Sequence, residues 1–257
     1  MYKRQILNVI ATSHGTDSVA GREAITLIRE QIKFLLAQRN DGVEYRIHAA
    51  YVDVESPSVD DAAASLPNDE PCVIVPILLS TGFHTQVDLR RAARNSGIER
   101  ISIGESLGPD ARLAALTRAR LEEAGWTPGD GPVVQGAAGS SRADGRADMS
   151  RAAELLAEEL HVPVHHGFVA AIDPKFHEVV AEHQPKFAAT YLLAEGFFAG
   201  KMRRDAESTG VPVKVAAPLV NAQGGASAAV VAECFIDRMD AAIAVSYTHL
   251  TLPTSDL

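Results

Sequence analysis

The sequence predicts an α/β protein made of two tandem, duplicated lobes, each a small parallel sheet flanked by helices. Three observations carry that prediction. Short apolar runs alternate with segments of helical periodicity, which is typical of parallel sheets with right-handed crossovers. A cluster of Gly, Pro and Asp at 127–132 divides the chain. Motifs that precede this cluster recur after it in the same order, which indicates an internal duplication.

Within the first lobe, predicted strands alternate with predicted helices. Apolar residues at helical spacing, such as Ile28 and Ile32, favour a long helix after the first strand. Ser58 with Asp61 is typical of a capped helix start. The predicted strands are 7–12, 45–52, one within 71–84 and 100–103, and the predicted helices are 21–38, one from Ser58, 85–95 and 108–125.

The apolar stretch at 71–84 is the element around which the first lobe is organised. Its β-branched start and bounding turn residues favour a strand buried on both faces, and it ends in Gly82-Phe83-His84. If the first strand lies between the second and third, His14, Asp53 and His84 all follow the carboxyl ends of neighbouring strands. Parallel strands lie about 4.8 Å apart, so we expect these side chains to converge.

Two histidines and one carboxylate with open coordination positions suit a first-row divalent metal that is passed on. The second lobe provides an internal comparison, because it carries an apolar residue at each of the three positions. The first lobe is therefore expected to hold the site, and the second to supply a wall. The aligned pairs are His14 with Ala138, Asp53 with Ala170, and His84 with Phe198.

The cluster of Gly, Pro and Asp at 127–132 sets the expected domain boundaries. The N-terminal lobe, with the metal site, is expected over 6–126, and a degenerate C-terminal copy over 131–245. Residues 1–5 and 246–257 resemble translated sequencing-adapter sequence, so we expect non-native ends there and leave them out of the fold reasoning.

Composition restricts the classes of partner. A net charge of -9 argues against nucleic-acid binding, which needs a surplus of Lys and Arg. The two cysteines lie far apart in sequence and form no C-x-x-C motif, which fits a reducing compartment. No apolar stretch approaches the length of a membrane span. We therefore expect a cytoplasmic protein without membrane contact, and a monomer, because two fused lobes can close a cleft within one chain.

The His14-Gly15-Thr16 loop, the Tyr51-to-Pro57 turn and the run ending in His84 resemble the class II tetrapyrrole chelatases, specifically the two-lobed sirohydrochlorin chelatases and their cobalt-inserting relatives. The resemblance covers nearly all of residues 6–245. It implies a lyase-type enzyme that inserts Fe²⁺ or Co²⁺ into sirohydrochlorin during sirohaem or cobalamin biosynthesis. The histidines would bind the metal and accept pyrrole protons. A divalent metal, with Ni²⁺ as a further option, is then a substrate, and no permanently bound cofactor is expected.

The resemblance also implies residues for substrate binding. Sirohydrochlorin is a polycarboxylate, so cations are expected at the cleft, with Arg90 on the helix after His84 as the candidate. The family usually has Glu at the position of Asp53, and Glu55 is an alternative carboxylate on the same side of an extended segment. The expected substrate-binding residues are Gly15, Thr16, Ser80, Thr81, Gly82, Phe83 and Arg90.

Two other functions are compatible with parts of the pattern. A carrier that binds metal or tetrapyrrole without inserting would use the same residues, and only turnover separates it from a chelatase. A histidine phosphatase would use His14 as nucleophile, but that chemistry needs a phosphate-binding arginine beside it, and Ser13 stands there.

Overall fold

The first lobe is built on a parallel sheet whose strand order matches the prediction. The computed structural model describes residues 5–82, 87–170, 172–221 and 224–251. Its strands are β1 (Gln5–Ser13), β2 (Val43–Tyr51), β3 (Cys72–Pro76) and β4 (Ile101–Ile103). They lie in the order β2-β1-β3-β4, so the first strand does lie between the second and the third. The carboxyl ends of these three strands therefore meet at one edge.

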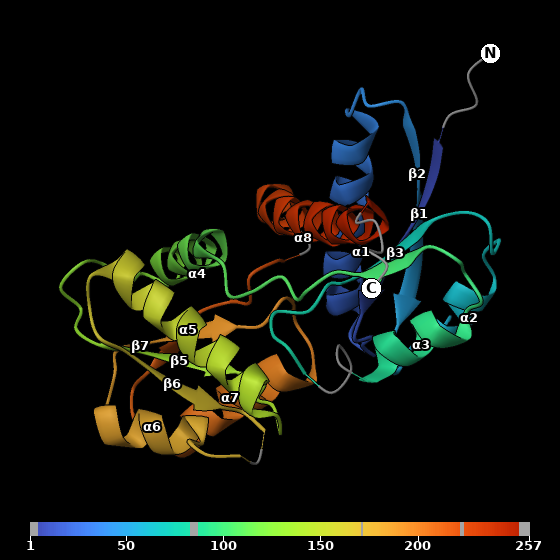
Figure 1. Ribbon diagram of the computed structural model, residues 1–257. Coiled ribbons are helices and arrows are strands. Elements are labelled where there is room, and N and C mark those ends of the chain that lie inside the picture. The colour runs from blue at the N-terminus through green and yellow to red at the C-terminus, as the bar shows by residue number, and fades with distance from the viewer. Residues whose placement is uncertain (1–4, 83–86, 171, 222–223, 252–257) are drawn as a thin grey trace, which may run out of the picture.

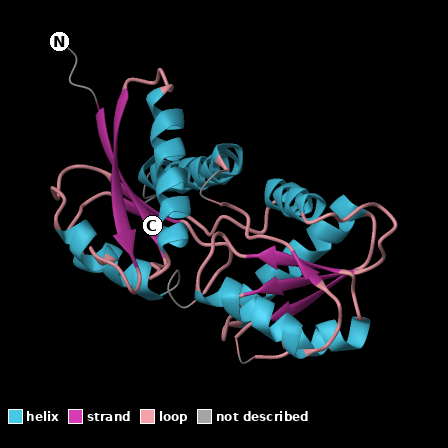
Figure 2. Cartoon of the chain, turned by 180° about the vertical axis from the view of Figure 1, so that it is seen from behind, coloured by secondary structure: helices cyan, strands magenta, loops and turns pink. Residues whose placement is uncertain are grey.

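The second lobe repeats this sheet. Its strands lie in the order β6-β5-β7-β8, again all parallel, which confirms the predicted duplication. Helices flank both sheets, and the two lobes stand side by side (Figures 1 and 2). The strands are β5 (Val133–Ala137), β6 (Val164–Phe168), β7 (Phe187–Tyr191) and β8 (Lys214–Val215).

Serine side chains cap the starts of two helices of the first lobe. The Ser18 side chain accepts a hydrogen bond from the Gly21 amide at the start of α1, and Ser58 accepts one from the Asp61 amide at the start of α2. No helix in the described ranges is long and apolar enough to cross a bilayer. The helices are α1 (Val19–Ala37), α2 (Val59–Ala64), α3 (Leu89–Asn95), α4 (Ala111–Glu123), α5 (Ala143–Leu160), α6 (Phe176–His183), α7 (Phe197–Ser208) and α8 (Gly225–Thr251).

The stretch at 71–84 is a strand only over its first third. After Pro76, the Ile77 amide still donates to the Thr12 carbonyl (2.6 Å), and the chain then leaves the sheet toward the second lobe. Its neighbour β4 pairs with β3 over three residues only, Cys72 to Ile74. The α-helix expected over 85–95 begins at Leu89; the first residues of that range lie outside those described.

The last helix of each repeat packs on the opposite lobe. Helix α4 lies against α5 and β7, whereas α8 lies against α1, β3 and β4 (Figure 1). Buried residues of both lobes, with Phe235 and Met239 of α8 among them, form one continuous cluster. The boundaries expected at 6–126 and 131–245 stay a prediction. The two sheets lie within them, apart from the first residue of β1, while the terminal helices cross between the lobes.

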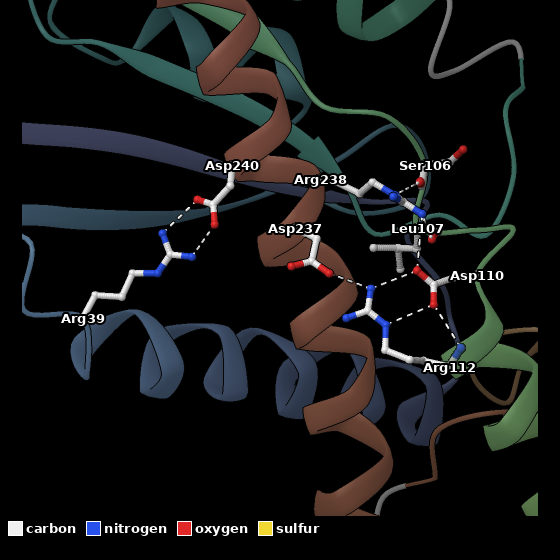
Figure 3. Close-up of polar contacts among 8 residues, drawn as sticks. All are labelled: Arg39, Ser106, Leu107, Asp110, Arg112, Asp237, Arg238 and Asp240. Carbon is white, nitrogen blue, oxygen red and sulfur yellow. Dashed lines mark hydrogen bonds and ion pairs between the residues drawn. The ribbon is translucent and has the colours of Figure 1, made fainter.

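Polar contacts fasten α8 to the first lobe (Figure 3). Arg39, just beyond α1, makes a two-pronged pair with Asp240 (2.8 and 2.5 Å). Arg112 at the start of α4 lies 2.7 Å from Asp237. Arg238 donates to the backbone carbonyls of the segment that leads from β4 into α4. Helix α8 is therefore bonded both to the end of α1 and to the segment that leads from β4 into α4.

Candidate functional site

A cavity of about 650 Å³ opens between the lobes. It lies at the carboxyl ends of β1, β3, β5 and β7, where residues from both lobes line it. This is the edge at which parallel α/β sheets bind their ligands. The predicted His14 lines the cavity and is exposed.

Backbone contacts fix the position of His14. Its carbonyl accepts a hydrogen bond from the Asp53 amide (3.0 Å), and the Ser13 carbonyl accepts one from the Val52 amide (3.0 Å). Gly15 has a φ of +93°, and a Cβ there would lie 2.0 Å from the Asp53 carbonyl oxygen. Only glycine fits this close approach. The loop that carries His14 is therefore fastened to the turn after β2.

The two candidate carboxylates have different surroundings. Asp53 is exposed, and its Oδ1 accepts a hydrogen bond from the Val54 amide (2.8 Å). Glu55 Oε1 accepts one from the Thr16 amide (2.9 Å), and its Oε2 lies 3.4 Å from Arg22 Nε. Neither carboxylate residue is among those that line the cavity. Glu55 holds the His14 loop in place, and the choice between the two as a metal ligand stays a prediction.

The segment around Glu55 differs from the extended one that was expected. Val54 has a φ of 65°, and the Glu55 amide donates to the Asp53 carbonyl (2.7 Å). This tight turn reverses the chain, so the two-residue periodicity of a strand does not apply. It directs Glu55 toward Thr16 instead of placing it alongside Asp53.

The complete predicted metal site lies only partly within the described residues. His84 and Phe83 are outside them. Within the ranges that are described, no three His, Cys, Asp or Glu side chains are grouped so that they could hold one ion. A site formed by His14, Asp53 and His84 therefore stays a prediction.

Five of the residues expected to bind substrate line the cavity: Gly15, Thr16, Ser80, Thr81 and Gly82. Arg90 is exposed on α3 and is not among the lining residues, so its role stays a prediction.

Two glycines bring the lobes together at the cavity. A Cβ on Gly145 of α5 would lie 2.1 Å from the Thr81 carbonyl oxygen, and one on Gly21 of α1 would lie 2.5 Å from the Glu195 carbonyl oxygen. The loop after the third strand of each sheet thus touches the first helix of the other lobe. Gly21, Thr81 and Glu195 are among the residues that line the cavity.

The second lobe supplies an apolar wall, as the alignment predicted. Phe197 and Phe198 begin α7 and line the cavity with side chains 72% and 37% exposed. Their rings meet edge to face, with centroids 5.5 Å apart. Phe198 is the counterpart of His84. Exposed aromatic faces at this position suit a flat, apolar ring system.

A buried arginine that the sequence reasoning missed supports the same edge. Arg29 of α1 is 8% exposed and donates to Ser13 Oγ (2.9 Å), Tyr51 Oη (3.1 Å) and the Ala50 carbonyl (3.3 Å). It ties the ends of β1 and β2 together, and one of its partners, Ser13, directly precedes His14. A charged residue on the apolar stripe of a helix, between Ile28 and Ile32, was the available signal.

The cysteines take no part in the site. Burial raises the pKa of the Cys72 and Cys234 thiols to about 12. Both thiols therefore stay protonated at neutral pH and are poor ligands and nucleophiles.

The comparisons with known proteins agree on one family. The CbiX family model matches residues 8–124. A sirohydrochlorin cobaltochelatase of Sulfurisphaera tokodaii is 30% identical over 91 residues, which is 35% of this chain and 72% of that protein. A sirohydrochlorin ferrochelatase of Bacillus subtilis is 26% identical over 171 residues, 62% of this chain. That alignment spans 65% of the ferrochelatase, slightly less than two thirds of its length.

A solved structure, SirB from Bacillus subtilis with Fe³⁺, has the same fold. It superimposes with a TM-score of 0.74 and 22% sequence identity, covering 94% of this chain and 97% of SirB. The likeness extends over both lobes, including the second, where the family model does not reach.

Proposed function

The chain belongs to the CbiX family of sirohydrochlorin chelatases, and from that membership we propose that it inserts Fe²⁺ or Co²⁺ into sirohydrochlorin. The observation that carries the proposal is the position of His14. It stands at the end of β1, exposed in a cavity between the lobes and fixed by the Gly15 turn. Sirohaem or cobalamin biosynthesis in the cytoplasm would be the setting.

The chemistry requires a base and a metal ligand at the macrocycle. Insertion of a divalent ion releases the inner pyrrole protons, and a neutral imidazole can accept a proton or bind the metal. His14 and His84 are proposed for these roles, with Asp53 as the carboxylate. Phe197 and Phe198 would contact the face of the macrocycle from the second lobe, where their rings are exposed.

Turnover tests the proposal and separates it from a carrier. Purified protein, sirohydrochlorin and excess Fe²⁺ or Co²⁺ are mixed without oxygen, and absorbance follows the metallated product. A chelatase forms many equivalents of product per protein above the uncatalysed background, whereas a carrier stops at about one. A protein that stops at one equivalent with both metals is not a chelatase.

Histidine variants test the site. His14→Ala and His84→Ala are each expected to lower kcat by about 100-fold or more, the usual contribution of a general base. His177→Ala, on α6 and outside the cavity lining, is the matched control and should keep wild-type turnover. Wild-type rates in both site variants would refute the assignment of these histidines.

A further inference from the structure

In the first lobe, the loop around Gly15 binds a carboxylate of the protein itself, that of Glu55. Glu55 accepts a hydrogen bond from the Thr16 amide (2.9 Å) and lies 3.4 Å from Arg22. Arg22 Nε also donates to the Thr16 carbonyl (2.8 Å), which holds the guanidinium beside the loop. The loop amide and the arginine therefore form a pair of donors for one carboxylate, and Glu55 fills that position.

The second lobe repeats these donors. Ser140 and Arg146 follow Thr16 and Arg22 at one constant offset in the sequence. Arg146 Nη1 donates to the Ser140 carbonyl (3.0 Å) and to the Ser141 carbonyl (2.9 Å), as Arg22 does in the first loop. The arginine is therefore held beside the loop in both lobes.

The carboxylate is the part that the second lobe lacks. Ile172 takes the place of Glu55 in an equivalent tight turn, in which its amide donates to the Ala170 carbonyl (2.8 Å). In the described part of the chain, Arg146 has no acidic partner and the Ser140 amide has no acceptor. The donors that bind an internal carboxylate in the first lobe therefore meet no carboxylate in the described part of the second.

We propose that the Ser140 amide and the Arg146 guanidinium bind a side-chain carboxylate of the tetrapyrrole, in the place that Glu55 occupies in the first lobe. The inference rests on the proposed function, because it takes the polycarboxylate sirohydrochlorin as the ligand. Ser140 and Ser141 line the cavity, and Arg146, which is not itself among the lining residues, is held against their carbonyls. Charge-assisted hydrogen bonds of this kind are among the stronger ones in proteins.

The acidic residues around the two loops differ. Asp17 and Glu55 are replaced by neutral residues in the second copy, whereas the arginine is kept. Asp144 and Asp148 stand where the first lobe has Ala20 and Ala24. Asp144 is paired with Arg142 at 2.7 Å, and Asp148 accepts a hydrogen bond from the Thr81 amide (2.7 Å). Both of these carboxylates have donors of their own, so in the described residues neither takes the place of Glu55 beside Arg146.

The test supplies the missing internal carboxylate. Ile172→Glu should place a carboxylate beside the Ser140 amide and Arg146, as Glu55 lies beside Thr16 and Arg22, and compete with the substrate. Its control, Ile172→Met, has similar length without an acceptor oxygen. Binding of metal-free sirohydrochlorin is measured by quenching of its fluorescence, and turnover gives KM and kcat. We expect Ile172→Glu to weaken binding and raise KM by about tenfold, the equivalent of about 1.4 kcal/mol, with kcat unchanged.

A second variant keeps the test decisive if Ile172→Glu does not fold, which circular dichroism shows. Ser141→Asp changes an exposed position to the acid found in the first lobe and should weaken binding by several-fold. Wild-type binding in these acidic variants, or equal weakening in Ile172→Met, overturns the subsite. A wild-type protein that neither binds nor metallates sirohydrochlorin would instead overturn the proposed function itself.

Discussion

The loops around Gly15 and Gly139 both turn at a glycine with positive φ, but the first has polar surroundings and the second apolar ones. In the first lobe, Gly15 faces the carbonyl oxygen of Asp53, and polar bonds from the turn after β2 hold the loop. In the second, Gly139 faces the side chains of Ile172 and Ala170 at 3.0 and 3.2 Å. The duplication therefore kept the turn and changed what surrounds it. The copy with polar contacts carries His14, while the second copy combines apolar neighbours with donors that meet no carboxylate in the described residues.

The largest expected effect is a difference between Gly15→Ala and Gly139→Ala. Both glycines have positive φ, so alanine is strained at each. At Gly15 the new Cβ also meets backbone at 2.0 Å, whereas at Gly139 it meets side chains that can move. We expect losses in unfolding free energy of about 3 kcal/mol at Gly15 and about 1.5 kcal/mol at Gly139. Urea denaturation measures both.

Turnover gives the same comparison a functional reading. Gly15→Ala displaces the His14 loop and should lower kcat, while Gly139→Ala should act mainly on KM, since it disturbs the proposed carboxylate subsite. Equal losses of stability and of kcat in the two variants would contradict the difference between the loops.

The parts of this molecule that follow from local pattern were predictable. The strand order, the duplication, the Ser58 cap and the cavity position of His14 all follow from periodicity, turn residues and the geometry of parallel sheets. The exchange of α4 and α8 between lobes was not. The periodicity of an amphipathic helix shows that one of its faces is buried, but it does not show which sheet covers that face.

The role of Glu55 was missed for a different reason. Its orientation depends on the positive φ of Val54, a conformation that β-branched residues rarely adopt. No propensity rule predicts such a turn at Val54. Arg29 was missed because its partners, Ser13 and Tyr51, come together only when β1 and β2 pair.

A smaller difference in stability is expected between variants of α4 and α8, the two helices that pack on the opposite lobe. Arg120 of α4 is 7% exposed and donates to the Leu219 carbonyl (3.2 Å), so Arg120→Met leaves a buried acceptor unpaired, at a cost of about 1–3 kcal/mol. Asp240 of α8 is 46% exposed in its pair with Arg39, so Asp240→Asn should cost less than about 1 kcal/mol.

Denaturant titration at low and high salt checks the comparison of these helices. The loss of unfolding free energy in Asp240→Asn should be smaller at high salt, because exposed ion pairs are screened. A larger loss for Asp240→Asn than for Arg120→Met would mean that the ion pairs of α8, and not buried polar contacts, dominate the exchange.

The smallest expected effect is a dependence of the unfolding free energy on pH, which comes mainly from histidines of the second lobe. Burial, followed by the charge of His183, lowers the pKa of His165, whose ring stacks on His183 with centroids 3.5 Å apart. Burial is also the main cause that lowers the pKa of His166, and in the first lobe that of His48. The native state therefore favours the neutral imidazoles, whereas in the unfolded chain they titrate near pH 6.5.

The sign of the effect follows from proton linkage. Below about pH 6.5 the unfolded state binds more protons than the native state, so stability is present above that pH and is lost as pH falls through the lower native pKa values. The unfolding free energy should thus be smaller at pH 5.5 than at pH 7.5. The double variant His165→Asn/His166→Asn should flatten this dependence more than His48→Asn, as measured by urea titration across that range. A flatter profile for His48→Asn would place the main pH-sensitive burial in the first lobe instead.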